Sequence, residues 1–280
     1  MADSSGRLWR RMWRRPPAVV GAAVVLLFVG LALGAPWIAR SDPQRSDYSR
    51  IRKPPSSANL FGTDDLGRDI FSRVVWGTRI SMQAGVFSIV LAIAVGVPAG
   101  LLSGSRSGIT DQLIMRLTDA WLAFPFLILA IGLVTIMGAS LTNATVAIGL
   151  AATPTYIRLT RGLVLSTRED DYVQAARALG AGGLRTILCH VLPNIVSALL
   201  VQATVSIPAA IIAEAILSFL GLGVPIEMVS WGTMLGEAQN ELIIGKWWQL
   251  AAATVFMAVF VTAFSLLTDA LRDALDPKLR

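Results

Sequence analysis

The residue types that carry out most protein chemistry are scarce in this chain of 280 residues. It has one cysteine and one histidine, Cys189 and His190, which are adjacent but have no third ligand or base beside them. A single cysteine excludes an internal disulfide and a cysteine-rich metal site. We therefore expect both side chains to pack rather than react. We expect no metal site and no catalytic residues, so the chain is predicted not to be an enzyme.

The lysines do not support nucleotide hydrolysis either. They occur only at positions 53, 246 and 278, and none lies in the G-x-x-x-x-G-K-[ST] pattern of a phosphate-binding loop. Lys246 follows a glycine but precedes Trp247. We expect no cofactor on this chain. If its activity uses ATP, another subunit must hydrolyse it.

The composition is that of an integral membrane protein. Hydrophobic residues make up 54% of the chain and charged residues 15%, whereas soluble chains average about 25% charged. Several apolar runs reach the roughly 20 residues that cross a bilayer. The net charge of +6 comes from basic residues clustered at predicted membrane edges, where anionic lipid headgroups and the positive-inside rule account for them. We therefore expect the lipid bilayer, and no nucleic acid, as a partner.

Six apolar runs predict an all-α fold with six transmembrane helices. The predicted spans are 17–39, 80–102, 117–138, 143–163, 194–216 and 247–270. The run 143–163 is the weakest, because Arg158 and Arg161 shorten its apolar part.

The arginine-rich N-terminus precedes the first apolar run. Residues 7–15, RLWRRMWRR, place apolar side chains on one helical stripe with arginines around it, which indicates an interfacial helix over 1–16. The alternative is the charged region of a signal peptide. We favour an uncleaved first span, because the run is longer than a usual signal-peptide core and no A-x-A site follows it.

Segment 40–78 is polar and is predicted to be extracytoplasmic. The second half of 61–81, FGTDDLGRDIFSRVVWGTRIS, has the pattern of a short surface helix that Asp64 or Asp65 could cap.

The charges of the loops predict the orientation. Arginines lie at the N-terminus and in the loops 103–116, 164–193 and 271–280, which places these segments and both termini in the cytoplasm. The predicted outer loops 139–142 and 217–246 contain only Lys246 as a basic residue. Residues 39–79 depart from the rule, with eight basic and five acidic residues that are partly balanced.

The cytoplasmic loop 164–193 has a helical pattern. Ser166 to Glu169 match an S-x-x-E capping box, and Gly180 is placed to end the helix that follows. A second amphipathic set leads to Pro193, which suits the first turn of the next span. The pattern predicts two short helices separated by glycine. They either lie on lipid headgroups or dock on a partner, and the small residues around Gly180 favour docking.

This loop resembles the "EAA" loop of ABC importer permeases, which reads E-A-A-x-x-x-G followed after nine residues by I-x-L-P. Here Gln174 stands in place of the glutamate and His190 in place of the isoleucine. In that family the loop is the coupling helix that docks in a cleft of the ATPase subunit. The resemblance implies that ATPase-coupling residues are Tyr172, Gln174, Ala175, Ala176, Leu179, Gly180, Leu192 and Pro193.

Three further stretches resemble the "C" permease of the dipeptide/oligopeptide subfamily. They are FGTDDLGRDIFSRVVWGTRIS at 61–81, AEAILSFLGLGV at 213–224 with SWGTML at 230–235, and LRDALDPKLR at the end. The resemblance implies a type I importer fold with a permease domain over 79–270 and a cytoplasmic tail over 271–280.

The resemblance also implies an outer "scoop" over 217–246 that meets the substrate-binding protein. The residues assigned to this scoop or gate are Glu214, Phe219, Gly221, Gly223 and Trp231. From the residues alone, the alternative for the outer loop is a re-entrant lid of unrelated purpose, and Glu214 is an interfacial anchor or a subunit contact rather than a substrate ligand.

The function that the resemblance implies is ATP-driven import of dipeptides or oligopeptides through the bacterial plasma membrane. The expected partners are a paralogous permease subunit in a heterodimer, two ATPase subunits that hold ATP and magnesium, and an extracytoplasmic binding protein. One alternative is import of another small solute, such as nickel or haem. A different class, a stand-alone secondary transporter or channel, is less favoured because no clear repeat and no mid-span acidic chain are present.

Overall fold

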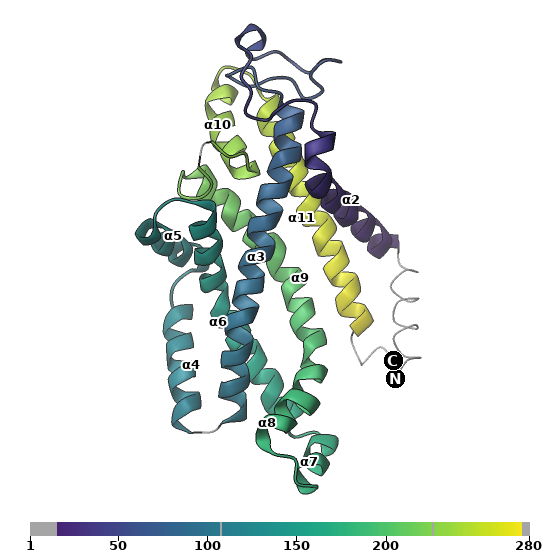
Figure 1. The fold of residues 1–280 in the computed structure, drawn as a ribbon, viewed down its shortest axis with the longest axis vertical. Helices are drawn as coiled ribbons and strands as arrows, with labels where there is room; N and C mark the ends of the chain where they lie inside the picture. The colour runs from purple at the N-terminus through teal and green to yellow at the C-terminus, as the bar shows by residue number, and fades with distance from the viewer. Residues whose placement is uncertain (1–15, 107, 226, 276–280) are drawn as a thin grey trace.

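The computed structural model describes residues 16–275 except 107 and 226, and these form a helical bundle elongated along one axis (Figure 1). The helices are α2 (Pro16–Ile38), η1 (Tyr48–Arg50), α3 (Ile70–Ser105), α4 (Ile109–Leu122), α5 (Phe126–Met137), α6 (Leu141–Thr167), α7 (Asp171–Ala178), α8 (Gly183–Arg185), η2 (Thr186–Val191), α9 (Leu192–Phe219), α10 (Trp231–Ile243) and α11 (Trp248–Leu275). Within the described residues, extended pairing is limited to one antiparallel bridge between Thr63 and Asp69. The all-α prediction is therefore confirmed.

Helices occupy all six predicted span positions. By length and composition, four described helices qualify as spans: α2, α3, the continuous helix 183–219, and α11. The predicted span 143–163 corresponds to α6, which is 27 residues long but less apolar than these four. The predicted interfacial helix over 1–16 lies outside the described residues except for Pro16.

The predicted span 117–138 is not one straight helix. The α4–α5 pair passes the same test only when taken together, and the two helices are bent by 92°. Pro125 is the residue before α5, with extended backbone angles, and its ring explains why the chain leaves the α conformation just before it. This pair would bring the number of spans to five.

α3 begins earlier than predicted. It runs for 36 residues from Ile70, so the predicted short surface helix is the first part of a longer helix, and the predicted domain boundary at residue 79 falls inside α3. Asp69, rather than Asp64 or Asp65, caps it, because its side chain accepts a hydrogen bond from the backbone N–H of Ser72. Arg73 and its neighbours are therefore part of a long helix rather than of a separate surface segment.

Glycines bring α3 and α6 into close contact. Gly96, Gly100 and Gly104 recur every four residues and face α6. A Cβ at Gly100 would lie 2.6 Å from the Cβ of Thr160, so only glycine permits this separation. The absence of side chains between the two backbones is how small residues allow membrane helices to pack closely.

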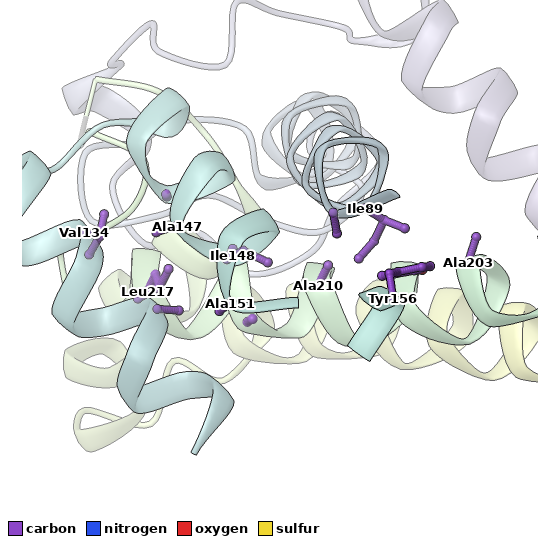
Figure 2. Packing of buried hydrophobic residues seen from close by; sticks show 13 residues of the cluster. Ile89, Val134, Ala147, Ile148, Ala151, Tyr156, Ala203, Ala210 and Leu217 are labelled. Carbon is purple, nitrogen blue, oxygen red and sulfur yellow. The ribbon is translucent and has the colours of Figure 1, made fainter. Parts of the chain in front are cut away.

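The largest buried cluster joins α3, α5, α6 and α9. Figure 2 shows Ile89, Ala147, Tyr156, Ala203 and Leu217 in this cluster, all of them buried. Many of its members are alanines, which again allows the helices to approach closely. This core fixes the middle of the bundle and leaves the two ends to be organised by other contacts.

The two ends of the long axis carry different structures. We call residues 164–193, with α7, the α7 end, and residues 40–69 together with 217–249, with α10, the α10 end. Figure 1 shows α7 and α10 at opposite extremes of the bundle, joined by α3, α6 and α9. The residues predicted to couple to an ATPase lie at the first end, and those predicted to form the outer scoop lie at or next to the second.

Candidate functional site

The α7 end projects from the bundle as a short helix. The predicted capping box is wrong: Ser166 and Thr167 belong to the last turn of α6, and Glu169 pairs with Arg168 instead. Asp170 is the N-cap of α7 but makes no side-chain cap hydrogen bond. The chain thus leaves α6 through a tight turn rather than through a capped start.

Most of α7 faces away from the chain. Val173 is its one buried residue, and it packs with Val164 of α6 and Val191 of η2. The side chains of Tyr172 and Leu179 are 45% and 89% exposed. Ala175 is exposed and Ala176 is half-buried. α7 is therefore anchored at one point and presents small residues flanked by two large ones.

Gln174 has a partner within the loop. Its side-chain amide donates a hydrogen bond to the backbone oxygen of Glu169, at 3.0 Å. The amide in place of a glutamate therefore closes the turn between α6 and α7. The geometry gives this residue a local role.

Gly180 ends α7, as predicted. Its φ is +90°, and the backbone N–H groups of Gly180 and Ala181 donate to the oxygens of Arg177 and Ala176. This double closure is a Schellman motif, which needs the left-handed conformation that glycine adopts readily.

The second predicted helix of the loop is the beginning of α9. α8, η2 and α9 form one continuous helix over 183–219, with a π-helical turn at Thr186–Val191. Leu192 is half-buried, and the exposed Pro193 lies in the first turn of α9, as predicted. Cys189 is exposed and His190 is half-buried. Within the described residues, no group of three or more His, Cys, Asp or Glu is placed to hold a metal ion.

The predicted outer residues divide into a buried set and an exposed set. Trp231 is fully buried, and its indole N–H donates to the backbone oxygen of Val74. Glu214 is also fully buried and accepts a hydrogen bond from the Ser218 hydroxyl at 2.7 Å. A Cβ at the buried Gly223 would lie 2.3 Å from that hydroxyl oxygen. Phe219 and Gly221 are exposed.

An ion network that the sequence did not predict holds the α10 end. The guanidinium of Arg73, which is fully buried, donates to the carboxylates of Asp64 and Glu237. Arg68 contacts the same two carboxylates, through bonds of 2.6 Å and 3.2 Å. We call these four residues the α10-end network. It joins the loop before α3, the first turn of α3 and α10.

Two further acidic residues, Glu241 and Asp65, lie beside this network. Glu241 of α10 receives a bidentate pair from Arg52, at 2.7 Å and 2.8 Å. Desolvation and the nearby Asp64 carboxylate raise the pKa of Asp65, while Arg68 opposes the shift. The sequence signal for this region was the density of Asp and Arg in the stretch 61–81, but Glu237 lies 164 residues beyond Arg73.

The chain matches two family models. Residues 96–280 match "Binding-protein-dependent transport system inner membrane component", and residues 5–55 match "N-terminal TM domain of oligopeptide transport permease C".

Curated relatives align with almost the whole chain. The glutathione transport system permease protein GsiD of Pectobacterium atrosepticum is 42% identical over 275 residues, which are 97% of this chain and 90% of that protein. The di/tripeptide transport system permease protein DppC of Pseudomonas aeruginosa is 42% identical over 278 residues, with 97% and 91% covered.

A solved structure shares the fold. The inward-facing MetNI methionine ABC transporter has a chain that superposes with a TM-score of 0.61 at 18% identity. The superposition covers 74% of this chain and 98% of that chain.

Proposed function

The chain belongs to the family of binding-protein-dependent transport system inner membrane components, and from this premise we propose that it imports short peptides. Family membership makes it a multi-pass permease subunit of an ABC importer in the inner membrane. The peptide substrate is supported by two relatives, whose names specify glutathione and di- or tripeptides.

We propose a division of labour among the subunits. Such an importer includes ATPase subunits and a substrate-binding protein. We infer that this chain pairs with a paralogous permease and that two ATPase subunits bind ATP and magnesium. This chain itself is proposed to bind no cofactor and to catalyse no reaction. Its own role is to change its contacts between two states, since a subunit with equal contacts in both states couples nothing.

The observation that carries the coupling role is the exposure of α7. We propose that the α7 end is cytoplasmic, as are both termini, and that α7 docks in a cleft of an ATPase subunit. The exposed Tyr172 and Leu179, together with the small Ala175 and Ala176, are the proposed contact surface. Closure of the ATPase subunits on ATP would then pull α7 and open the pathway outward, and hydrolysis would reset it.

We propose that the α10 end faces the binding protein. Phe219 and Gly221 are exposed there and are the proposed contacts. The buried Glu214, Gly223 and Trp231 would shape this surface from below rather than touch the binding protein.

An Ala176→Asp substitution tests the coupling role. A carboxylate at the centre of a tight contact is buried without a partner, so we expect ATPase association to weaken by about tenfold or more. Recovery of ATPase subunits with the tagged permease pair measures this. Ala58→Asp makes the same change at an exposed position of the α10 end and should have no effect. Normal recovery and normal peptide-stimulated ATP hydrolysis by Ala176→Asp would contradict the docking assignment.

Three further measurements test the partner, the transport class and the substrate class. The exposed native cysteine is first removed by Cys189→Ser. A photo-crosslinker on an Ala176→Cys variant should then capture an ATPase subunit, whereas capture of lipid alone favours a helix lying on headgroups. ATP-independent peptide uptake by this chain alone would contradict the importer function. The ligand that copurifies with the cognate binding protein tests the substrate class.

A further inference from the structure

α4 has little apolar packing to hold it against the rest of the chain. Thr118 is its one buried residue. The apolar side chains of Ile109, Leu113 and Leu117 are 77%, 58% and 66% exposed. Non-directional apolar burial, which fixes most helices in place, therefore contributes little to the position of α4 within this chain.

Polar contacts centred on Asp111 take its place. Arg161 of α6 donates from Nε to Oδ1 of Asp111 at 2.6 Å and from a terminal nitrogen to Oδ2 at 2.7 Å. The hydroxyl of Ser103, at the end of α3, donates to the same carboxylate. The side chains of Arg161 and Asp111 are only 29% and 19% exposed. One carboxylate thus ties three helices together through a two-pronged, partly buried pair, which is the strong form of ion pair.

The Asp111 carboxylate lies close to the last turns of α6, which lead into the α7 end. Arg161 is three residues before Val164, which packs against Val173, the buried anchor of α7. A Cβ at Gly104 of α3 would lie 2.7 Å from the Cβ of Val164, so the two helices touch here. Arg168, just beyond α6, donates to the backbone oxygen of Gly104 at 3.4 Å. α7 therefore packs against the cytoplasmic end of α6 less than one helical turn from Arg161, so a movement of α7 would be transmitted to Arg161.

We propose that Ser103, Asp111 and Arg161 form a clasp that makes α4 follow α6 when α7 moves. The clasp rests on the proposed coupling function of α7 and assigns Asp111 and Arg161 as positioning residues for transport. An ion pair with two parallel hydrogen bonds fixes both distance and orientation, so α4 cannot slide along α6 while the pair is intact. Without the clasp, α6 moves and leaves α4 behind, while α5 stays packed against α6 in the central core, and ATP is hydrolysed with little transport.

A second ion pair on the same two helices provides the control. Arg158 of α6 donates to Asp119 of α4 at 2.6 Å, through one hydrogen bond. The side chains of this pair are 56% and 55% exposed within the chain, and its one hydrogen bond fixes orientation less than the two-pronged contact of Asp111 with Arg161. The same chemical change can therefore be made at a partly buried two-pronged pair and at an exposed single one.

The first experiment compares Asp111→Asn with Asp119→Asn in the complete transporter in vesicles, with loaded binding protein. We expect Asp111→Asn to assemble and hydrolyse ATP. Peptide transported per ATP should fall about threefold or more, the range in which changes along a coupling route act. Asp119→Asn should stay within about twofold of wild type. An unchanged transport ratio in assembled Asp111→Asn complexes would overturn the proposal.

A charge exchange separates positioning from general damage. The double variant Asp111→Arg with Arg161→Asp restores an ion pair of the opposite sense and should recover part of the lost transport ratio. Recovery no greater than that of the worse single variant would contradict a pairwise clasp.

A distance measurement works even where a variant fails to assemble, because it uses the intact clasp. Spin labels on Leu117→Cys and Gly162→Cys, in a Cys189→Ser background, report the separation of α4 and α6. Gly162 is exposed and a side chain there meets no atom within 4 Å. The distance should be the same in the nucleotide-free and ATP-trapped complexes. A change between these two states would overturn the proposal.

Failure of the clasp and failure of the proposed function give different results. If α7 does not dock on an ATPase, Ala176→Asp leaves ATPase association intact, and the photo-crosslinker at position 176 captures no ATPase subunit. If only the clasp is wrong, Ala176→Asp still weakens association while Asp111→Asn transports normally.

Discussion

α10 and α7 are both short amphipathic helices that follow a long helix, but they are held in very different ways. α10 begins with a reciprocal capping box between Ser230 and Thr233, whereas α7 begins with no side-chain cap. Six of the 13 residues of α10 are buried, against one of the eight in α7. α10 is also joined to the rest of the chain by ion pairs from Arg52, Arg68 and Arg73.

The difference indicates which end is held in place by contacts within the chain and which end lacks such contacts. At the α10 end the buried Asp64, Arg68 and Arg73 are ion-paired within the chain, so the network holds this end without a partner. α7 and its C-cap leave their large side chains and small-residue surface uncovered, and Val173 is the one buried residue of α7. A helix of eight residues is too short to be stable through its own hydrogen bonds, so its remaining stability must come from what it packs against. The proposed ATPase cleft supplies that contact.

The largest expected effect comes from breaking the α10-end network. Arg73→Gln leaves the buried Asp64 carboxylate with Arg68 as its remaining cation in the network, and loss of one member of a buried pair costs about 3–5 kcal/mol. Chemical unfolding of the detergent-solubilised subunit measures this. Arg50→Gln removes an exposed pair with Asp47 and should cost under about 1 kcal/mol. Equal stability of the two variants would show that the network does not hold this end.

A smaller effect is expected between the ends, at the contact of α3 and α6. Gly100→Ala places a methyl group 2.7 Å from the backbone oxygen of Ile157, and overpacking of this kind costs about 1–3 kcal/mol. Gly132→Ala makes the same change on an exposed face of α5, where nothing lies within 4 Å. It should be neutral or stabilise by up to about 1 kcal/mol, because alanine favours helix. Unfolding midpoints of the pair test the contact, and a stable Gly100→Ala would argue against it.

The smallest effect on folding is expected at the α7 end. Leu179 is 89% exposed, so Leu179→Ser should change stability by less than about 0.5 kcal/mol. ATPase association should nevertheless weaken about tenfold, because burial of a leucine in an interface contributes roughly 1.5–3 kcal/mol. Ile243→Ser is matched, since Ile243 is 81% exposed on α10, and it should alter neither stability nor ATPase recovery. If Leu179→Ser lowered the stability of the subunit, Leu179 would contribute to folding as the α10-end network does, and the contrast between the two ends would be wrong.

The sequence predicted the positions of the long helices because membrane spans are set by local apolar length. Single residues with strict backbone preferences were equally readable: Gly180 ends α7, and Pro193 lies in the first turn of α9. The bend between α4 and α5 was missed because a hydropathy window averages over it. The dipeptide Phe124–Pro125 was the available signal, since the residue before a proline avoids the helical conformation.

Long-range polar contacts could not be predicted. The partners Arg73 and Glu237 are far apart along the chain, and no local pattern pairs them. The partner of Arg161 could not be predicted either, because α4 carries two aspartates, Asp111 and Asp119, and the sequence does not distinguish between them. The predicted capping box at Ser166 failed for a related reason, because packing of Val164 continues α6 past the serine. The exposure of α7 was expected from its resemblance to the family, but its function stays a prediction until a partner is shown.

The π-helical turn at Thr186–Val191 affects how the length of the helix over 183–219 can vary. A π turn is an α-helix with one extra residue, and each residue of an α-helix advances the chain by about 100°. In the π turn the extra residue is taken up without this added rotation, so deleting it would restore a regular helix and leave the segments on either side in nearly the same orientation. The turn therefore absorbs a difference of one residue in length. Chains of this family with one residue fewer at this point would hold the α7 end in nearly the same direction.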